Sequence, residues 1–112
     1  MKMYGIKNCD TVKKAKKFLD AQSIDCDFHD FKAEGLSKAT LVNWLKSTDW
    51  EILLNRRGTT WRKLSDTDKE TINKTNAIKL MLEQPTLIKR PVLEYKNKIY
   101  VGFDEAIYKT FK

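Results

Sequence analysis

The hydrophobic period changes twice in the first third of the chain. Met1 to Ile6 is a short apolar run that predicts a strand. From Asp10 the period becomes helical, with one apolar face formed by Val12, Ala15, Phe18 and Leu19. From Ile24 to Phe31 apolar and polar side chains alternate, which predicts a second strand. Strand, helix and strand in this order predict a βαβ unit with parallel strands.

The middle of the chain, from about residue 37 to 84, predicts short helices rather than strands. Ser37 is the expected N-cap of a first helix. Ser65, with Asp68 three positions later, predicts the start of another. A further predicted helix covers Thr75 to Glu83, and Pro85 ends it. We expect this segment to form a helical insert.

The last quarter of the chain predicts a hairpin followed by a helix. Leu87 to Tyr95 reads as a strand, Lys96 to Lys98 as a turn, and Ile99 to Val101 as the returning antiparallel strand. Asp104 is the expected N-cap of a last helix with two inward side chains, Ile107 and Phe111. The whole pattern is βαβ, a helical insert, then ββα. It predicts one α/β domain over residues 1–112 with a mixed sheet.

Composition places the chain among ordinary folded proteins. It has 112 residues, of which 41% are hydrophobic and 33% charged. No apolar run is long enough for a membrane helix or a signal peptide. Its 2 cysteines are too few for a disulfide framework. We therefore expect a cytoplasmic protein that works as a monomer.

The net charge is +7, which favours anionic partners but is also typical of a solvated basic surface. Direct nucleic-acid binding is the least favoured function, because the basic residues are dispersed. The tryptophans are expected to serve packing rather than base stacking: Trp44, Trp50 and Trp61.

Cys9 lies between the first predicted strand and the first predicted helix. A helix start favours an anion, and the thiolate is the reactive form of cysteine. Lys7 adds positive potential, and Asn8 and Thr11 are candidate hydrogen-bond partners of the sulfur. Asn8 or Asp10 is the expected helix cap. The alternative is a small buried side chain, but the polar neighbours favour a nucleophile.

Cys9 has no second cysteine nearby, because Val12 occupies the last position of a Cys-x-x-Cys motif. An oxidised Cys9 must therefore be resolved by an external thiol or by a distant cysteine. Cys26 is the internal candidate, although its strand pattern favours burial. His29 is either a base for Cys9 or a solvated histidine. One histidine and two cysteines are too few for common zinc sites, so we expect no metal.

The Arg90-Pro91 step is the second candidate site. The isomer of this bond cannot be read from the sequence alone. Arg90 is suited to bind a carboxylate or oxyanion through two hydrogen bonds, and the alternative is an arginine on the surface.

Four segments together resemble the ArsC-like arsenate reductase family of thioredoxin-fold proteins, and its YffB branch most of all. They are Tyr4 to Thr11, Arg57 to Leu64, Ile88 to Pro91, and Gly102-Phe103. The resemblance implies a thioredoxin-like core with a helical insertion between its two halves. It implies that Cys9 is the nucleophile, and that Arg90 precedes a cis proline, Pro91, opposite it.

The resemblance also implies what the site acts on. Arsenate reductases coupled to glutaredoxin use three arginines; Arg90 matches one, the second falls at Asn55 or Arg56, and none stands near Gly102. An incomplete arginine set favours a glutathione-dependent thiol reductase, which is the activity that the resemblance to the YffB branch implies. Glutathione is then a co-substrate, with no permanently bound cofactor. The alternatives are arsenate reduction with glutaredoxin, or binding of RNA polymerase as in the Spx regulators.

Overall fold

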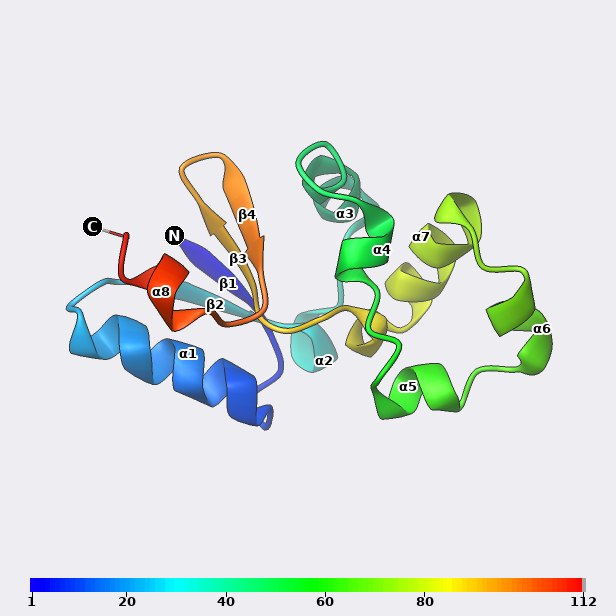
Figure 1. Ribbon diagram of the computed structural model, residues 1–112, viewed down its shortest axis with the longest axis horizontal. Coiled ribbons are helices and arrows are strands. Elements are labelled where there is room, and N and C mark those ends of the chain that lie inside the picture. Colours follow the sequence, from blue (N-terminus) through cyan, green and yellow to red (C-terminus); the bar gives the residue numbers. More distant parts are fainter. Residues whose placement is uncertain (112) are drawn as a thin grey trace. The chain divides into compact units, whose positions relative to one another are not determined.

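The computed structural model describes residues 1–111 (Figure 1). Its elements follow in chain order: β1 (Lys2–Gly5), α1 (Asp10–Ala21), β2 (Asp27–Asp30), α2 (Phe31–Glu34), α3 (Lys38–Trp44), α4 (Trp50–Leu53), α5 (Thr59–Arg62), α6 (Asp66–Glu70), α7 (Lys74–Glu83), the 3-10 helix η1 (Pro85–Leu87), β3 (Val92–Tyr95), β4 (Lys98–Val101) and α8 (Glu105–Tyr108). They form two compact units. The first is Met1–Glu34 with the chain from Arg90 onward, and the second is Gly35–Lys89.

All the strands described belong to the first unit, in one sheet of order β2-β1-β3-β4. β1 pairs with β2 in parallel, as the βαβ pattern predicts. β1 also pairs with β3 antiparallel, with Tyr4 opposite Val92, and β3 pairs with β4 antiparallel. The predicted mixed sheet is therefore confirmed.

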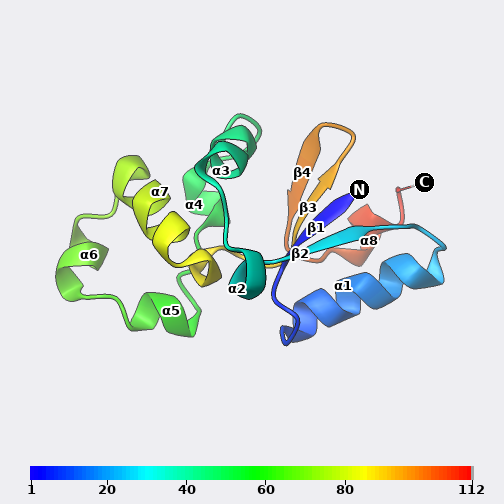
Figure 2. The same cartoon turned by 180° about the vertical axis from the view of Figure 1, so that it is seen from behind.

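The core of the first unit lies where α1 and α8 cover one face of the sheet (Figures 1 and 2). Its buried members are Met3, Val12, Ala15, Leu19, Leu93, Tyr108 and Phe111. Ile107 was predicted to point inward, and this is wrong, because it is 41% exposed. Asp104 caps α8 through the amides of Ala106 and Ile107, and in this phase Tyr108, 1% exposed, takes the inward place.

Two strands are shorter than the hydrophobic pattern predicts. β2 begins at Asp27 and gives way to α2 at Phe31, because the Asp30 carboxylate accepts from the Lys32 amide (2.9 Å). Glu34 closes the same turn by accepting from the Asp30 amide (3.1 Å). β3 begins only at Val92, because Leu87 belongs to η1 and Pro91 has no amide hydrogen to donate.

The second unit is helical, as predicted, and extends slightly beyond the expected insert. Ser37 and Ser65 cap α3 and α6 through the amides three residues later (3.2 and 3.1 Å). The unit closes on itself where its last residue, Lys89, donates its amide hydrogen to the Leu53 carbonyl (2.8 Å). Its most deeply buried apolar side chains, 2% exposed or less, are Leu41, Trp44, Leu53, Leu54, Ala77, Met81, Leu87 and Ile88.

Two buried tyrosines of the first unit differ in how their hydroxyls are satisfied. The Tyr108 hydroxyl has no hydrogen-bond partner among the described residues. The Tyr4 hydroxyl, 5% exposed as a residue, donates to Glu94 Oε1 (3.2 Å). A buried hydroxyl without a partner costs stability, whereas a satisfied one contributes to it.

We therefore predict opposite effects for two matched substitutions. Tyr108→Phe removes an unsatisfied group and is expected to leave the free energy of unfolding unchanged or raise it by about 1 kcal/mol. Tyr4→Phe removes a hydrogen bond and is expected to lower it by about 1 kcal/mol. Urea denaturation of both variants measures the difference. A large loss of stability on Tyr108→Phe would contradict the prediction.

Candidate functional site

Cys9 itself is the N-cap residue of α1, with φ −87° and ψ 123°. Its amide donates a hydrogen bond to the Ile6 carbonyl (3.3 Å), and its carbonyl accepts a hydrogen bond from the Lys13 amide (3.0 Å). The expectation that Asn8 or Asp10 caps the helix is wrong, because the tight turn from Ile6 to Cys9 makes Cys9 the flanking residue. No side-chain oxygen caps α1. Its first amides are therefore left available to the sulfur.

The thiol of Cys9 has a lowered pKa, through opposing effects. Burial is the largest and raises the pKa. It is outweighed by the backbone amide of Val12, by the hydrogen bond and positive charge of the Arg90 side chain, and by the backbone amide of Thr11. Each of these favours the thiolate over the thiol. The sulfur therefore lies in an environment built for negative charge, which is the condition for a reactive cysteine.

The pairing of β1 with β3 brings Arg90 to this site. Arg90 and Pro91 immediately precede Val92, which lies opposite Tyr4 in the sheet. The Arg90-Pro91 bond is cis, as the resemblance implies. Pro91 also accepts a hydrogen bond from the Gly102 amide (2.8 Å), which connects the start of β3 to the end of β4. Arg90 thus comes from a segment distant in sequence and joins the helix start.

The other predicted site residues are not equally involved. Thr11 acts through its backbone amide. Lys7 and Asn8 are exposed in the turn before Cys9, and neither contributes to lowering the pKa of the thiol. Arg56 belongs to the second unit, where its guanidinium lies 5.4 Å from the centre of the Trp61 ring. Its role in the site stays a prediction.

Sequence reasoning missed Val12 as a hydrogen-bond donor. Its side chain marks it as a core residue, and it is fully buried. The amide lies three residues after the N-cap, where an N-capping group ordinarily accepts a hydrogen bond. This position was the signal that could have identified it.

Cys26 does not lie near Cys9. It lines a small cavity of about 160 Å³ with three residues from the second half of α1: Lys16, Leu19 and Asp20. Leu19 is about 15 Å along the helix from the N-cap, whereas a disulfide needs Cα atoms within about 7 Å. Burial also raises the pKa of the Cys26 thiol. Cys26 is therefore unsuited to resolve an oxidised Cys9 in this fold.

His29 is not a base for Cys9. It lies opposite Tyr4 in the β1-β2 pair, with ring centres 4.9 Å apart. Because side chains alternate along a strand, Tyr4 and His29 face away from Met3 and from the core on which Cys9 packs. His29 Nδ1 instead lies 3.7 Å from Glu34 Oε2.

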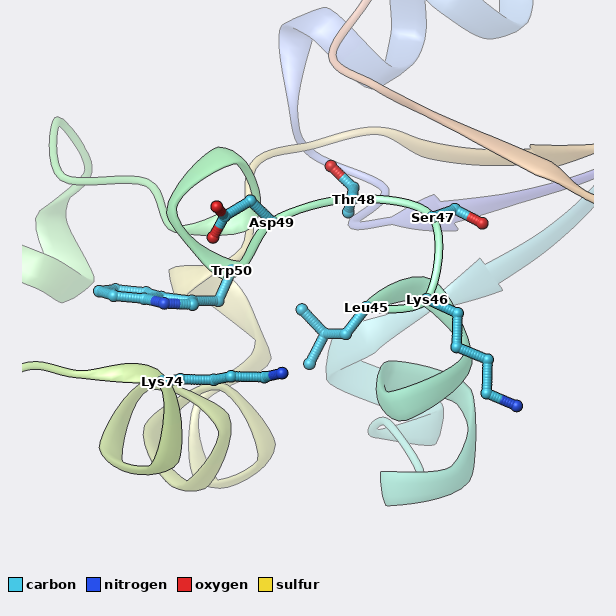
Figure 3. A pocket seen from close by; sticks show the side chains of 7 residues that line it. All are labelled: Leu45, Lys46, Ser47, Thr48, Asp49, Trp50 and Lys74. Atoms are coloured by element: carbon cyan, nitrogen blue, oxygen red, sulfur yellow. The ribbon is translucent and has the colours of Figure 1, made fainter.

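The second unit has a pocket of its own, of about 540 Å³ (Figure 3). Trp50, Lys74 and Leu45 are among the residues that line it, and in this view the Trp50 ring lies above the Lys74 side chain, whose end points toward Leu45. Trp50 is thus half-buried at a hollow, whereas Trp44 is in the core as expected. None of the predicted site residues lines this pocket.

Two further features are absent from residues 1–111. No three or more histidine, cysteine or carboxylate side chains converge as a metal site would require. No helix in this range is both long and apolar enough to cross a membrane.

The position of Arg90 predicts how its removal changes Cys9. Arg90→Gln in a Cys26→Ser background is expected to raise the pKa of the Cys9 thiol by about 1, because a hydrogen bond and a positive charge are lost. Ultraviolet absorbance of the thiolate against pH measures it. Lys89→Gln is the matched control, since it removes a charge from the neighbouring, exposed position. An equal rise in both variants would contradict a specific contact.

Comparison with known proteins places this arrangement in a family. The model of the ArsC family matches residues 4–111. An uncharacterized protein of Haemophilus influenzae is 43% identical, over 96% of this chain and 95% of that protein. The more distant transcriptional regulator Spx of Streptococcus pyogenes is 26% identical, over 93% of this chain and 78% of that protein.

Solved structures agree in fold. The structure of the YffB protein has 46% identity and a TM-score of 0.92, covering 96% of this chain and 95% of that one. An arsenate reductase (ArsC) related protein from Brucella melitensis has 50% identity and a TM-score of 0.79, covering 98% and 92%. The four-stranded mixed sheet with its helical insertion is thus the thioredoxin-like fold of these relatives. The chain belongs to the ArsC family.

Proposed function

We propose that this ArsC-family protein is a glutathione-dependent thiol-disulfide reductase with Cys9 as its single nucleophile. One observation carries the proposal. The Cys9 sulfur accepts hydrogen bonds from the backbone amides of Thr11 and Val12 and from the guanidinium of Arg90, and these together lower the pKa of the thiol. A thiolate at neutral pH attacks disulfide sulfur far faster than a thiol does.

The reaction follows from a lone thiolate. Cys9 attacks the glutathione sulfur of a glutathionylated substrate, the S–S bond of the substrate breaks, and the substrate leaves as a thiolate that takes a proton from water. Cys9 then carries glutathione as a mixed disulfide. The thiolate of a second glutathione attacks the glutathione sulfur of this mixed disulfide. Glutathione disulfide leaves and the Cys9 thiolate is restored, so that the substrate thiol is released and one glutathione is oxidised, its partner in the new disulfide being the glutathione unit that the substrate carried.

An external thiol is needed because Val12 and Cys26 cannot supply an internal one. Val12 is buried in the core, and Cys26 lies beside the far half of α1. Arg90, next to Cys9 and Pro91, is the group we assign to a glutathione carboxylate. Lys7, Asn8, Thr11 and Arg56 are assigned to the surrounding anion site.

Arsenate reduction is the second candidate, and the contact of Arg90 with the thiolate favours it, because such a pair also suits an oxyanion. The relative from Brucella melitensis is described as related to arsenate reductase. Gly102, adjoining Pro91, offers no side chain to an oxyanion. Because no arginine stands near Gly102, an oxyanion would be held by an incomplete set of arginines, and we therefore prefer glutathione as the anionic partner.

Reaction with glutathione disulfide tests the proposal. We predict one glutathione adduct on the wild-type protein, located at Cys9 by mass spectrometry of its peptides. Cys26→Ser is expected to keep the adduct, because the raised pKa of Cys26 disfavours attack. Cys9→Ser is expected to lose it. An adduct on Cys26 alone, or none, would overturn the proposal.

A coupled assay separates the two candidates. The protein and glutathione are mixed with a glutathionylated peptide, or, with glutaredoxin added, with arsenate, and NADPH consumption by glutathione reductase is followed. We expect turnover with the peptide that is lost on Cys9→Ser. Turnover with arsenate alone would make arsenate reduction the function.

A further inference from the structure

The first turn of α1 approaches the end of β1 unusually closely at one residue. A Cβ atom built on Gly5 would lie 2.7 Å from Cγ2 and 3.7 Å from Cγ1 of Val12. Contacts of that kind under 3.0 Å are essentially never found between real side chains. Val12 is fully buried, so it has no room to move away. Glycine at position 5 is therefore what allows the helix to pack at this distance.

The groups that stabilise the Cys9 thiolate divide between the two sides of this contact. The amides of Thr11 and Val12 belong to α1 and move with Cys9. The Arg90 guanidinium belongs to the sheet, because Val92, two residues on, pairs with Tyr4 beside Gly5. The separation of α1 from β1 thus sets the distance between the Cys9 sulfur and the Arg90 guanidinium. It does not change the hydrogen bonds from the amides of α1 to the sulfur.

The connection between β1 and α1 cannot absorb a change in that separation. It consists of Ile6, Lys7 and Asn8, and it is closed by the hydrogen bond from the Cys9 amide to the Ile6 carbonyl (3.3 Å). A short connection held by its own hydrogen bond transmits a displacement of the helix start to Cys9 rather than buffering it.

We propose that Gly5 is a positioning residue, whose missing side chain lets Val12 pack against β1 and so holds the Cys9 sulfur within reach of the Arg90 guanidinium. Val12 then has two parts to play. Its side chain sets the spacing of helix and strand, and its amide donates to the sulfur. The inference rests on the proposed function only in taking the Cys9 thiolate as the reactive group.

The test is a set of variants in the Cys26→Ser background, with the pKa of Cys9 measured by thiolate absorbance. Gly5→Ala is expected to raise this pKa by about 0.5 or more, because the contact with Arg90 is weakened. Adding Val12→Ala removes both methyl groups of Val12, including Cγ2, which collides with the new Cβ, and is expected to return the pKa to its original value. A rise that Val12→Ala does not reverse would overturn the proposal.

A second arm shows whether the effect passes through Arg90. In an Arg90→Gln background, Gly5→Ala is expected to leave the pKa unchanged, since the interaction it weakens is already gone. Equal rises with and without Arg90 would overturn the proposal. Gly35→Ala is the stability control: its φ of +68° makes alanine strained there, in open space and in the other unit. It is expected to lower the melting temperature without changing the pKa of Cys9.

The role of Gly5 can still be tested if the Gly5→Ala variant does not fold, and also if the proposed function fails. If Gly5→Ala does not fold, Val12→Ile tests the contact from the helix side, because a larger buried side chain also displaces the helix start; an unchanged pKa in a folded Val12→Ile protein would count against the proposal. If the wild-type protein forms no adduct with glutathione disulfide, the pKa measurements still decide the role of Gly5.

Discussion

The pairing of β1 with β3 is the interaction on which the site depends. It is antiparallel and places Tyr4 opposite Val92. The strand β1 continues through a short turn to Cys9, and Arg90 stands just before β3, so this one register brings together two residues from opposite ends of the sequence. A slip of one residue would move Arg90 by about 3.3 Å and reverse the faces of the whole strand. Burial of Met3 and Leu93 on the same face fixes the register, because a slip would expose both.

The helical insert leaves that pairing undisturbed. It enters the sequence after Glu34 and returns at Arg90, and its own contacts close it. The Leu54–Ile88 bridge and the hydrogen bond from the Lys89 amide to the Leu53 carbonyl hold the last residues of the insert. The segment that immediately precedes Arg90 is therefore ordered by the second unit, while Val92 and the residues after it are ordered by the sheet. Arg90 is the first residue of the first unit after the insert.

The order of elements and the position of Cys9 could be predicted because they depend on local patterns. A change of hydrophobic period marks β1 and α1, and serine caps mark α3 and α6. The ends of β2 and β3 could not be predicted so well, because local hydrogen bonds compete with the alternating pattern. Asp30 and Glu34 form a helical turn from residues that could equally continue a strand.

The missed parts of the site have no residue-type signature. A backbone amide such as that of Val12 is present at every position except proline, so only its place after the N-cap distinguishes it. The absence of a side chain at Gly5 matters only because Val12 lies opposite, and that proximity is a tertiary fact. Ile107 was the predicted core side chain of α8, but the phase set by the Asp104 cap turns Tyr108 inward in its place.

The same packing explains why Cys9 acts alone. In a dithiol site position 12 would hold the second cysteine, but here its side chain fills the space between α1 and β1. The Val12 side chain sets the distance between the helix and the strand, so this position is not free for a second cysteine. The other thiol of the chain, Cys26, lies beside the second half of the helix. In the proposed reaction the resolving thiol comes from solution, and Arg90, whose side chain contacts the Cys9 sulfur, is the group that we assign to its carboxylate. The proposed dependence on an external thiol thus rests on how α1 packs on β1.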